Sequence, residues 1–578
     1  MNDLYALAAE RFAKSIEMPG RFFSVEAEHI AEACLAMARR FHRGGRLMAF
    51  GAGNAVTDAQ HVSVEFVHPI LVGKRALPAI ALGTDIAASL GLAKRMGWSA
   101  LYAQQLATLG CAEDIALGID PTGEDEAILA GLKTAQERGM LTIGLLGGVT
   151  KTPGAFTPDF SFVVPSADTA VVQETHETLY HMFWELVHVF FEHPLLLSEP
   201  SKTSSTLNVH GTDHADSTRS LHGVRSLDDA DLRLTSMSPS SARSSSVCVP
   251  DQNGYCAICA DQGLPGRVLK LLPGNMALVD MRADAPADAP AGTHDEHEVA
   301  LDLVHDVKVG DRLLIHLDVA IASLPDEVDT QRDPQPDLFA DFLYPFLEEK
   351  HTPDSARGGS QGDDARVLLK ATLDEVRGSI LHKARDIATL RQTFFAEQGE
   401  MLARAATTMT RAFGSGKTLL AFGNGGSATD AQDIAADFMN PGSGSGFGPG
   451  KSYRSLPALS LTNDIGVVTA VGNDVGFDNV FVRQIIAFGR PGDIALGFSS
   501  SGQSPNLLAA FAQAKKMQLT TIGIAGYDGG QMARAGLEYC FVVHSTYVPR
   551  IQEVQATIYH TLWTLIQHIL EADHEIRR

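Results

Sequence analysis

The sequence predicts an α/β protein with two doubly wound parallel sheets, each covered by helices on both faces, and a small all-β barrel between them. Three observations predict this fold class. The segment RLMAFGAGNAVTDAQHVSVEF near residue 50 reappears as TLLAFGNGGSATDAQDIAADF near residue 420, so one unit is used twice. Within each unit, short apolar strands alternate with amphipathic helices, which is typical of a parallel sheet between two helix layers. Between the units, the pattern changes to short alternating strands.

The repeats define the two expected α/β domains. We predict the first over residues 1–195 and the second over residues 366–578. Each begins with an amphipathic helix, continues through three short strands that alternate with helices, and ends on a long helix. The predicted strands are LMAF (47–50), DIALGI (114–119) and LTIGLL (141–146) in the first domain, and LLAF (419–422), DIALGF (493–498) and TTIGIA (520–525) in the second.

The region between the domains divides into three parts. Residues 196–250 are predicted to be a linker, because they are rich in Ser and Thr and poor in large apolar residues. Residues 251–328 carry short strands separated by Pro, Gly and Asp, which predicts the barrel. Residues 329–365 are a second linker, in which DLFADFLYPFLEE is expected to form an amphipathic helix that packs on another part of the protein.

Composition and charge exclude several classes of protein. Hydrophobic residues make up 45% of the chain and charged residues 20%, so it is not collagen-like, coiled-coil or wholly disordered. The 46 Lys and Arg against 69 Asp and Glu give a net charge of −23, and we expect no nucleic acid and no membrane as partners. The start MNDLYALAAERFAKSIE lacks the order of a signal peptide, so we expect a cytoplasmic location.

A Ser-rich turn in the second domain is a candidate phosphate site. In GFSSSGQSPN (497–506), a strand leads through several hydroxyl side chains into the start of a helix. Free backbone N–H groups and the helix dipole favour an anion at such a point. The alternative is that Ser501 or Ser504 only caps the helix.

Five ordered segments extend this observation over residues 370–572: FGNGGSATDAQDIAADF, VGNDVGFDNVF, GFSSSGQSPNLLAAF, GYDGGQMA and PRIQEVQATIYH. Together they resemble the SIS (sugar isomerase) domain and, within it, the sedoheptulose-7-phosphate (phosphoheptose) isomerase family. The resemblance implies an aldose–ketose isomerase that moves a proton of a phosphosugar through an enediol, with a divalent metal such as zinc as cofactor. The substrate contacts that it implies are Asn424, Gly425, Gly426, Asn473, Asp474, Ser499, Ser500, Ser501, Ser504 and Gln552.

The same resemblance implies four metal positions in each domain, two on the last helix and two on the helix after the Gly-rich turn, which is GAGNA (51–55) in the first domain and GNGGS (423–427) in the second. In the second domain they are Asp433, Asp437, Gln552 and His560, with Asp437 and His560 also implied in catalysis. Both residues on its first helix are Asp, where the family has His and Glu, and Asp is a harder ligand than imidazole. In the first domain they are His61, Glu65, Gln173 and His181, with Glu65 as the base and His181 as the acid.

The first domain has kept these metal positions but has lost the phosphate turn. Asp120, Glu124 and Asp125 stand where the second domain has Ser499, Gln503 and Ser504, and carboxylates repel phosphate. One interpretation is a composite site that combines the metal residues of the first domain with the serines of the second. The alternatives are a self-contained site in the second domain and a non-catalytic phosphosugar-binding scaffold. In the latter cases His61 and His181 are ordinary core residues of a decayed domain.

Family members assemble with active sites between subunits, so the resemblance also implies that the two domains pair and that the chain forms a homo-oligomer. The final helices carry Trp184 and Trp563 in equivalent places. We expect them to bury much of the contact between the domains.

The predicted barrel resembles the HypC/HupF family of hydrogenase-maturation chaperones over residues 256–325, through CAICADQGLPGRVLKLLPGNMALVDM and EVALDLVHDVKVGDRLLIHLDVAIASL. The resemblance implies an OB-like barrel that carries an iron complex transiently on Cys256 or Cys259, assisted by His316. Its partners would be a HypD-type scaffold protein and the large subunit of a [NiFe]-hydrogenase. A CxxC pair also fits half a zinc site, a redox pair or no function. On this interpretation, the SIS domains are an isomerase beside the chaperone, or a scaffold or sugar-phosphate sensor that serves hydrogenase assembly.

Overall fold

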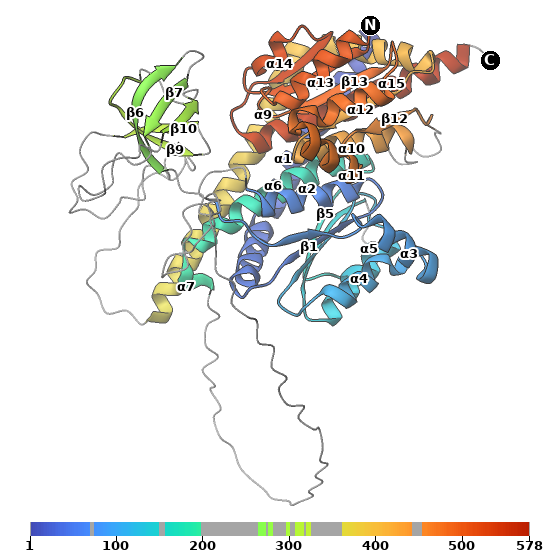
Figure 1. Ribbon diagram of the computed structural model, residues 1–578. Helices are drawn as coiled ribbons and strands as arrows, with labels where there is room; N and C mark the ends of the chain where they lie inside the picture. The colour runs from blue at the N-terminus through green and yellow to red at the C-terminus, as the bar shows by residue number, and fades with distance from the viewer. Residues whose placement is uncertain are drawn as a thin grey trace, which may run out of the picture. The chain divides into compact units, whose positions relative to one another are not determined.

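The computed structural model describes residues 2–69, 74–148, 156–197, 264–272, 276–280, 296–300, 307–316, 319–324, 361–441 and 453–576 (Figure 1). They form two compact units, one with both α/β domains and the other with the barrel. The stretch DLFADFLYPFLEE, Cys256 and Cys259 lie outside the described residues. Among the described helices, none combines the length and the apolar character needed to cross a membrane.

The first domain contains a five-stranded parallel sheet of order β2-β1-β3-β4-β5. Every residue of β1 and β3 is buried, which explains their unbroken apolar sequences. The strands are β1 (Leu47–Gly51), β2 (Ala79–Ala81), β3 (Ile115–Asp120), β4 (Leu141–Gly147) and β5 (Phe160–Val164). The helices are α1 (Asn2–His42), α2 (Ala55–Val67), α3 (Ile86–Met96), α4 (Leu101–Leu109), α5 (Glu126–Glu137), α6 (Thr169–Phe191) and α7 (Pro194–Leu197).

The second domain repeats this topology with the order β12-β11-β13-β14-β15. Its strands are β11 (Leu419–Gly423), β12 (Ala458–Ser460), β13 (Ile494–Ser499), β14 (Thr520–Gly526) and β15 (Tyr539–Val543). Its helices are α9 (Gln361–Gly414), α10 (Gly426–Met439), α11 (Ile465–Val475), α12 (Val480–Phe488), α13 (Pro505–Lys516), α14 (Gly530–Arg534) and α15 (Val548–Ile576). The prediction of two parallel sheets with covering helices is confirmed.

The two outer strands of each sheet were not predicted. β2 and β12 have only three residues each, too few to show a periodic pattern. β5 and β15 alternate between partly and fully buried residues, as expected where one face of an edge strand is less covered. The sequence therefore identifies the sheet centres better than their edges.

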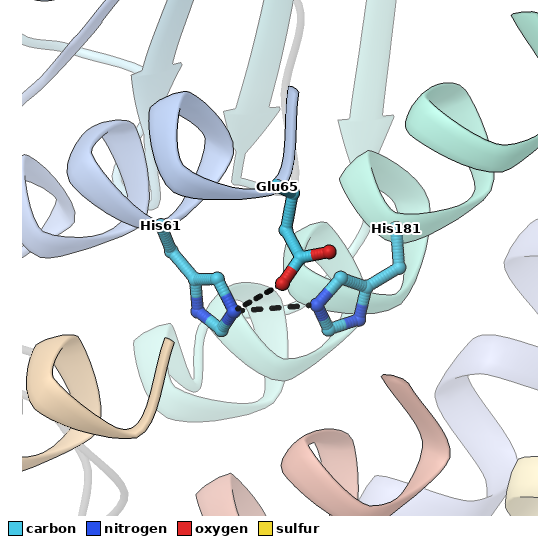
Figure 2. A group of neighbouring side chains, drawn as sticks. All are labelled: His61, Glu65 and His181. Atoms are coloured by element: carbon cyan, nitrogen blue, oxygen red, sulfur yellow. Dashed lines mark hydrogen bonds and ion pairs between the residues drawn. The ribbon is translucent and has the colours of Figure 1, made fainter. Parts of the chain in front are cut away.

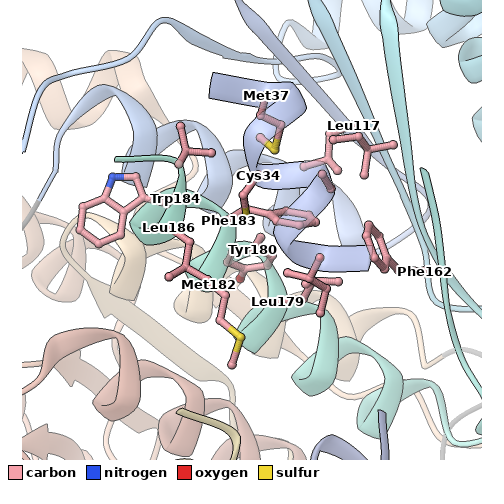
Figure 3. Close-up of a cluster of buried hydrophobic side chains, with 14 of the residues drawn as sticks. Cys34, Met37, Leu117, Phe162, Leu179, Tyr180, Met182, Phe183, Trp184 and Leu186 are labelled. Atoms are coloured by element: carbon pink, nitrogen blue, oxygen red, sulfur yellow. The ribbon is translucent and has the colours of Figure 1, made fainter. Parts of the chain in front are cut away.

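Two long helices exchange their N-terminal parts between the domains. Ala8 and Phe12 of α1 lie in the core of the second domain, whereas Ile380 and Ala384 of α9 lie in the core of the first. Figure 3 shows the first core, where Cys34 from the later part of α1 lies among side chains of α6. Each core is therefore completed by a helix that belongs mainly to the other domain.

The final helices α6 and α15 contact each other, and both are largely buried. Trp184 belongs to the core of the first domain and Trp563 to that of the second. Polar side chains meet across the two helices: Thr557 donates to Glu174 at 2.8 Å, and His181 and Glu553 lie 3.0 Å apart. The domains thus pair through buried charges and hydroxyls at this point.

The second unit is a closed barrel with strand order β10-β8-β7-β6-β9. Its core contains Val268, Ala277, Val279, Val299 and Leu313. The strands are β6 (Leu264–Leu272), β7 (Met276–Asp280), β8 (Glu296–Ala300), β9 (Arg312–His316) and β10 (Val319–Leu324). Its likeness to an OB fold or to the HypC/HupF family stays a prediction.

Candidate functional site

A buried cluster of His61, Glu65 and His181 lies where the two α/β domains meet (Figure 2). His61 and Glu65 are one turn apart on α2, and His181 projects from α6. Nε2 of His61 lies 3.6 Å from Oε1 of Glu65 and 3.5 Å from Nε2 of His181. The i, i+4 spacing predicted from the sequence thus places both α2 side chains at one point.

Gln552 of the second domain completes this cluster. Its Nε2 lies 3.2 Å from Nε2 of His61, and its Oε1 has no hydrogen-bond partner, nor has Oε2 of Glu65. Four ligand atoms around a tetrahedral zinc, with bonds of about 2.0–2.1 Å, are ~3.4 Å apart. The donor set, its spacing and the unpartnered oxygens therefore fit a divalent metal. We call these four residues the first cluster.

Both imidazoles of the first cluster are oriented by a second hydrogen bond. Nδ1 of His181 lies 3.0 Å from Oε1 of Glu553, a residue of the second domain, and Nδ1 of His61 lies 3.2 Å from the hydroxyl of Tyr180. Such partners fix the ring and leave Nε2 facing the metal position. The second domain therefore both supplies a ligand and orients one.

A second cluster of Asp433, Asp437 and His560 occupies the equivalent place in the second domain. Nε2 of His560 lies 3.7 Å from Asp433 and 3.8 Å from Asp437. Gln173 of the first domain joins it by donating to Oδ2 of Asp433 at 3.0 Å. The expected grouping of each Gln with its own domain is therefore wrong. Because α6 and α15 lie side by side, Gln552 of the second domain joins the first cluster and Gln173 of the first domain joins the second cluster.

Hydrogen bonds already satisfy the groups of the second cluster. Asn54 donates to Asp437 at 2.6 Å, and Tyr559 donates to Asp433 at 2.7 Å. Burial alone would lower the pKa of His560, but its hydrogen bonds to Asp433 and Glu174 raise that pKa to about 10. His560 is therefore protonated at neutral pH, and an imidazolium nitrogen donates rather than ligates. The second cluster thus differs from the first, in which Oε2 of Glu65 and Oε1 of Gln552 have no hydrogen-bond partner.

The Gly-rich turn of the second domain faces the first cluster. A methyl group at Gly426, the first residue of α10, would overlap Nε2 of Gln552 and Nε2 of His61. The equivalent residue of the first domain is Asn54, whose side chain projects toward the second cluster and bonds to Asp437. The glycine thus lets His61 and Gln552 approach the turn of the second domain, whereas the Asn54 side chain fills the corresponding position beside the second cluster.

The Ser-rich turn follows β13 and is linked to the Gly-rich turn by a pair of amides, with Asn424 and Asn506 bonded at 2.9 and 3.0 Å. Oγ of Ser499 accepts from the backbone N–H of Gly502 at 3.0 Å and lies 3.2 Å from Oγ of Ser504. Ser504 does not cap α13 through its side chain. The capping alternative therefore does not hold for Ser504, and the turn remains a candidate anion site.

In the first domain, carboxylates occupy the corresponding turn. Asp120 accepts from the backbone N–H of Thr122 at 2.9 Å and of Asp125 at 2.7 Å. Asp125 in turn caps α5 by accepting from Ala127 and Ile128. The backbone donors that would bind phosphate are already used by the chain itself. This agrees with the predicted loss of phosphate binding in this domain.

Comparisons with known proteins identify relatives of this chain. The SIS domain model matches residues 12–147 and 384–526. The phosphoheptose isomerase of Nitratidesulfovibrio vulgaris (strain DSM 19637 / Miyazaki F) is 38% identical over 197 residues, or 34% of this chain and 91% of that protein. The chain belongs to the phosphoheptose isomerase family. The Desulfovibrio desulfuricans member is 43% identical over 34% of this chain and 90% of its own length. The structure of the Neisseria gonorrhoeae member, 32% identical, covers 33% of this chain and 99% of that one with a TM-score of 0.31.

Some residues implied by the resemblance to this family lie elsewhere. Asn473 and Asp474 are exposed on α11, where Asn473 donates to Asp474 at 2.8 Å, and this separates them from the buried clusters. His316, which the HypC/HupF resemblance of the barrel implies, is the last residue of β9. The remaining substrate residues lie in the Gly-rich turn, the Ser-rich turn and the first cluster.

Three contributors were missed: Asn54, Tyr180 and Glu553. The repeat itself contains a signal for each of them. Asn54 is the residue that replaces Gly426, and Tyr180 and Glu553 recur as Tyr559 and Glu174 beside the predicted ligands of the other domain. Comparing the repeats position by position would have selected these residues, although not their contacts.

Gly426→Ala should lower any activity of the first cluster at least 100-fold, because the new methyl group displaces His61 and Gln552. The control is Asn54→Ala, which removes a side chain from the equivalent position beside the second cluster. Steady-state kinetics of both variants check this expectation. Equal losses in the two variants would contradict the difference between the clusters.

Proposed function

We propose that this protein is an aldose–ketose isomerase of a phosphorylated heptose with one composite active site. The site consists of the first cluster together with the Gly-rich and Ser-rich turns of the second domain. The observation that carries the proposal is the contact of Gly426 and Gln552 with His61, which joins residues of both domains in one place. The second cluster is a decayed counterpart.

Different residues of this site bind the phosphate, hold the metal and transfer the proton. The hydroxyls and backbone N–H groups of the Ser-rich turn anchor the phosphate at the start of α13. His61, Glu65, His181 and Gln552 would hold a divalent metal, which when bound polarises the sugar carbonyl. Oε2 of Glu65, which has no partner, accepts the proton from the carbon next to the carbonyl and returns it to the neighbouring carbon.

His181 is better placed as a ligand than as the acid that the resemblance implies. Its Nδ1 is bonded to Glu553, so Nε2 alone faces the cluster. One nitrogen does not ligate a metal and donate a proton at the same time. Both transfers at carbon are therefore assigned to Glu65, and the proton that passes from the hydroxyl oxygen to the carbonyl oxygen is exchanged with water.

The direct test is to incubate the full chain with sedoheptulose 7-phosphate and zinc or another divalent metal, and to measure formation of the aldose 7-phosphate. Chelation should abolish the conversion, and added metal should restore it. Absence of conversion with every divalent metal, although sugar phosphate binds, would leave the non-catalytic scaffold as the function.

Ser501→Ala should raise the apparent KM by about 10- to 100-fold with little change in kcat, because it removes one hydrogen bond to a charged group, worth about 1.5–3 kcal/mol. The matched control is Thr122→Ala in the corresponding turn of the first domain, where Asp120 already occupies the backbone donors. Initial rates over a range of substrate concentration separate KM from kcat. An unchanged KM in Ser501→Ala would exclude this turn as the phosphate site.

For the barrel, we propose a role in handling the iron precursor of a [NiFe]-hydrogenase. The support is the HypC/HupF-like sequence together with a closed five-stranded barrel whose first strand carries Pro265 and Gly266. Iron content of the chain purified beside a HypD-type partner tests this role. Wild-type iron loading in a variant lacking both Cys256 and Cys259 would rule it out.

A further inference from the structure

A small, partly open cavity lies between the domains and borders the first cluster at His61. It has a volume of about 10 Å³, which is room for a single ion or water. Asp58 of α2, Glu177 of α6 and Asp430 of α10 line it. Its described lining holds carboxylates, hydroxyls, an amide and an imidazole, but no Lys or Arg side chain.

Three carboxylate oxygens in this lining have no hydrogen-bond partner: Oδ2 of Asp58, Oε1 of Glu177 and Oδ2 of Asp430. The three residues are 5%, 3% and 3% exposed. An isolated carboxylate that is buried without a partner costs several kcal/mol. A stable fold therefore needs a cation or protons at this point.

The geometry favours a cation. Glu177, Asp430 and His61 each offer a ligand atom, and these atoms lie within 4.8 Å of one another. Oxygen ligands from carboxylates in a space for one small ion suit a hard divalent cation of the magnesium class. Such an ion would also connect α2 and α6 of the first domain to α10 of the second.

Comparison of the repeats shows that only the first domain contributes the third carboxylate. Asp58 and Asp430 are equivalent residues, whereas the counterpart of Glu177 on α15 is Ala556. Glu177 therefore adds a third carboxylate to a pair that the repeat already supplies. It takes no part in the first cluster or in the Ser-rich turn.

We propose that Glu177 and Asp430, with Asp58 lining the same cavity, bind one hard divalent cation between the two α/β domains, at a site separate from the metal position of the first cluster. The cation neutralises the three carboxylates and links the domains. The proposal does not depend on isomerase activity.

The test uses the full chain, stripped of metal with a chelator and titrated with Mn²⁺ alone. We expect two bound equivalents in the parent. Glu177→Gln should lose one of them and His181→Ala the other. Mn²⁺ should therefore still raise the Tm of His181→Ala, but no longer that of the double variant. An unchanged stoichiometry in Glu177→Gln would overturn the proposal, because the carboxylates would then hold protons only.

Crystals of the parent chain soaked in Mn²⁺ give an answer that does not require any variant to fold. An anomalous peak between Glu177 and Asp430, distinct from one between His61 and His181, is the expected result. A peak at the first cluster alone would overturn the cavity site and leave the proposed isomerase site intact. A peak in the cavity alone would support the cavity site and contradict the metal position of the proposed isomerase site.

Discussion

Glu65→Gln should lower kcat by about 10²- to 10⁴-fold, the usual contribution of a positioned general base. Glu65 is only 1% exposed, and its Oε2 has no hydrogen-bond partner. Gln has nearly the same shape as Glu but does not accept the proton. Binding of the sugar phosphate should persist in this variant, because the phosphate contacts lie in the Ser-rich turn of the other domain. Stopped assays for kcat and calorimetry for sugar-phosphate binding measure the two effects separately.

The matched variant is Asp437→Asn, which makes the same chemical change at the equivalent position of the second cluster. Asp437 already accepts a hydrogen bond from Asn54 and faces a protonated His560. Turnover should stay within a few-fold of the parent. If Asp437→Asn abolished turnover and Glu65→Gln left it untouched, the second domain would be self-sufficient and the composite site would be wrong.

Glu174→Gln should cost about 3–5 kcal/mol of unfolding free energy, the usual loss when one partner of a buried ion pair is removed. Glu174 is fully buried and forms ion pairs with Arg11 and with Arg391, which are 3% and 0% exposed. Its replacement leaves two buried guanidinium groups without this carboxylate. Urea unfolding compares the variant with Glu113→Gln, whose half-exposed pair with Arg43 should contribute no more than about 1 kcal/mol. Equal losses in the two variants would contradict a structural role for Glu174.

The same carboxylate predicts a pH dependence. Burial alone would raise the pKa of Glu174, but Arg11, His560 and Arg391 hold it well below its usual range. The unfolded chain therefore binds a proton at this group at higher pH than the folded protein does. The stabilisation is complete above the ordinary value of about 4.5 and is lost as the pH falls below it. Glu174→Gln should flatten this acid limb, which unfolding curves between pH 3 and 7 can show.

The sequence predicts the central strands and the spacing within one helix, but not how distant helices pack around the site. LMAF and IALGI are buried on both faces and read as unbroken apolar strands, whereas the three residues of β2 carry no pattern. His61 and Glu65 are neighbours on one helix, so their spacing alone places them together. The exchange of Gln173 and Gln552 depends on how two helices 379 residues apart in the chain pack against each other. Periodicity within a helix carries no information about that packing.

The exchange of α1 and α9 has a consequence for the order of synthesis. The first domain leaves the ribosome complete to Leu197, yet Ile380 and Ala384 of its core are not made until more than 180 residues later. At roughly 5–20 residues per second, the nascent domain waits about 10–40 s for that helix. During this interval Ala8 and Phe12 also lack the second core in which they are finally buried. We therefore expect the nascent first half to need a chaperone, and a chain cut between the domains after folding to stay associated.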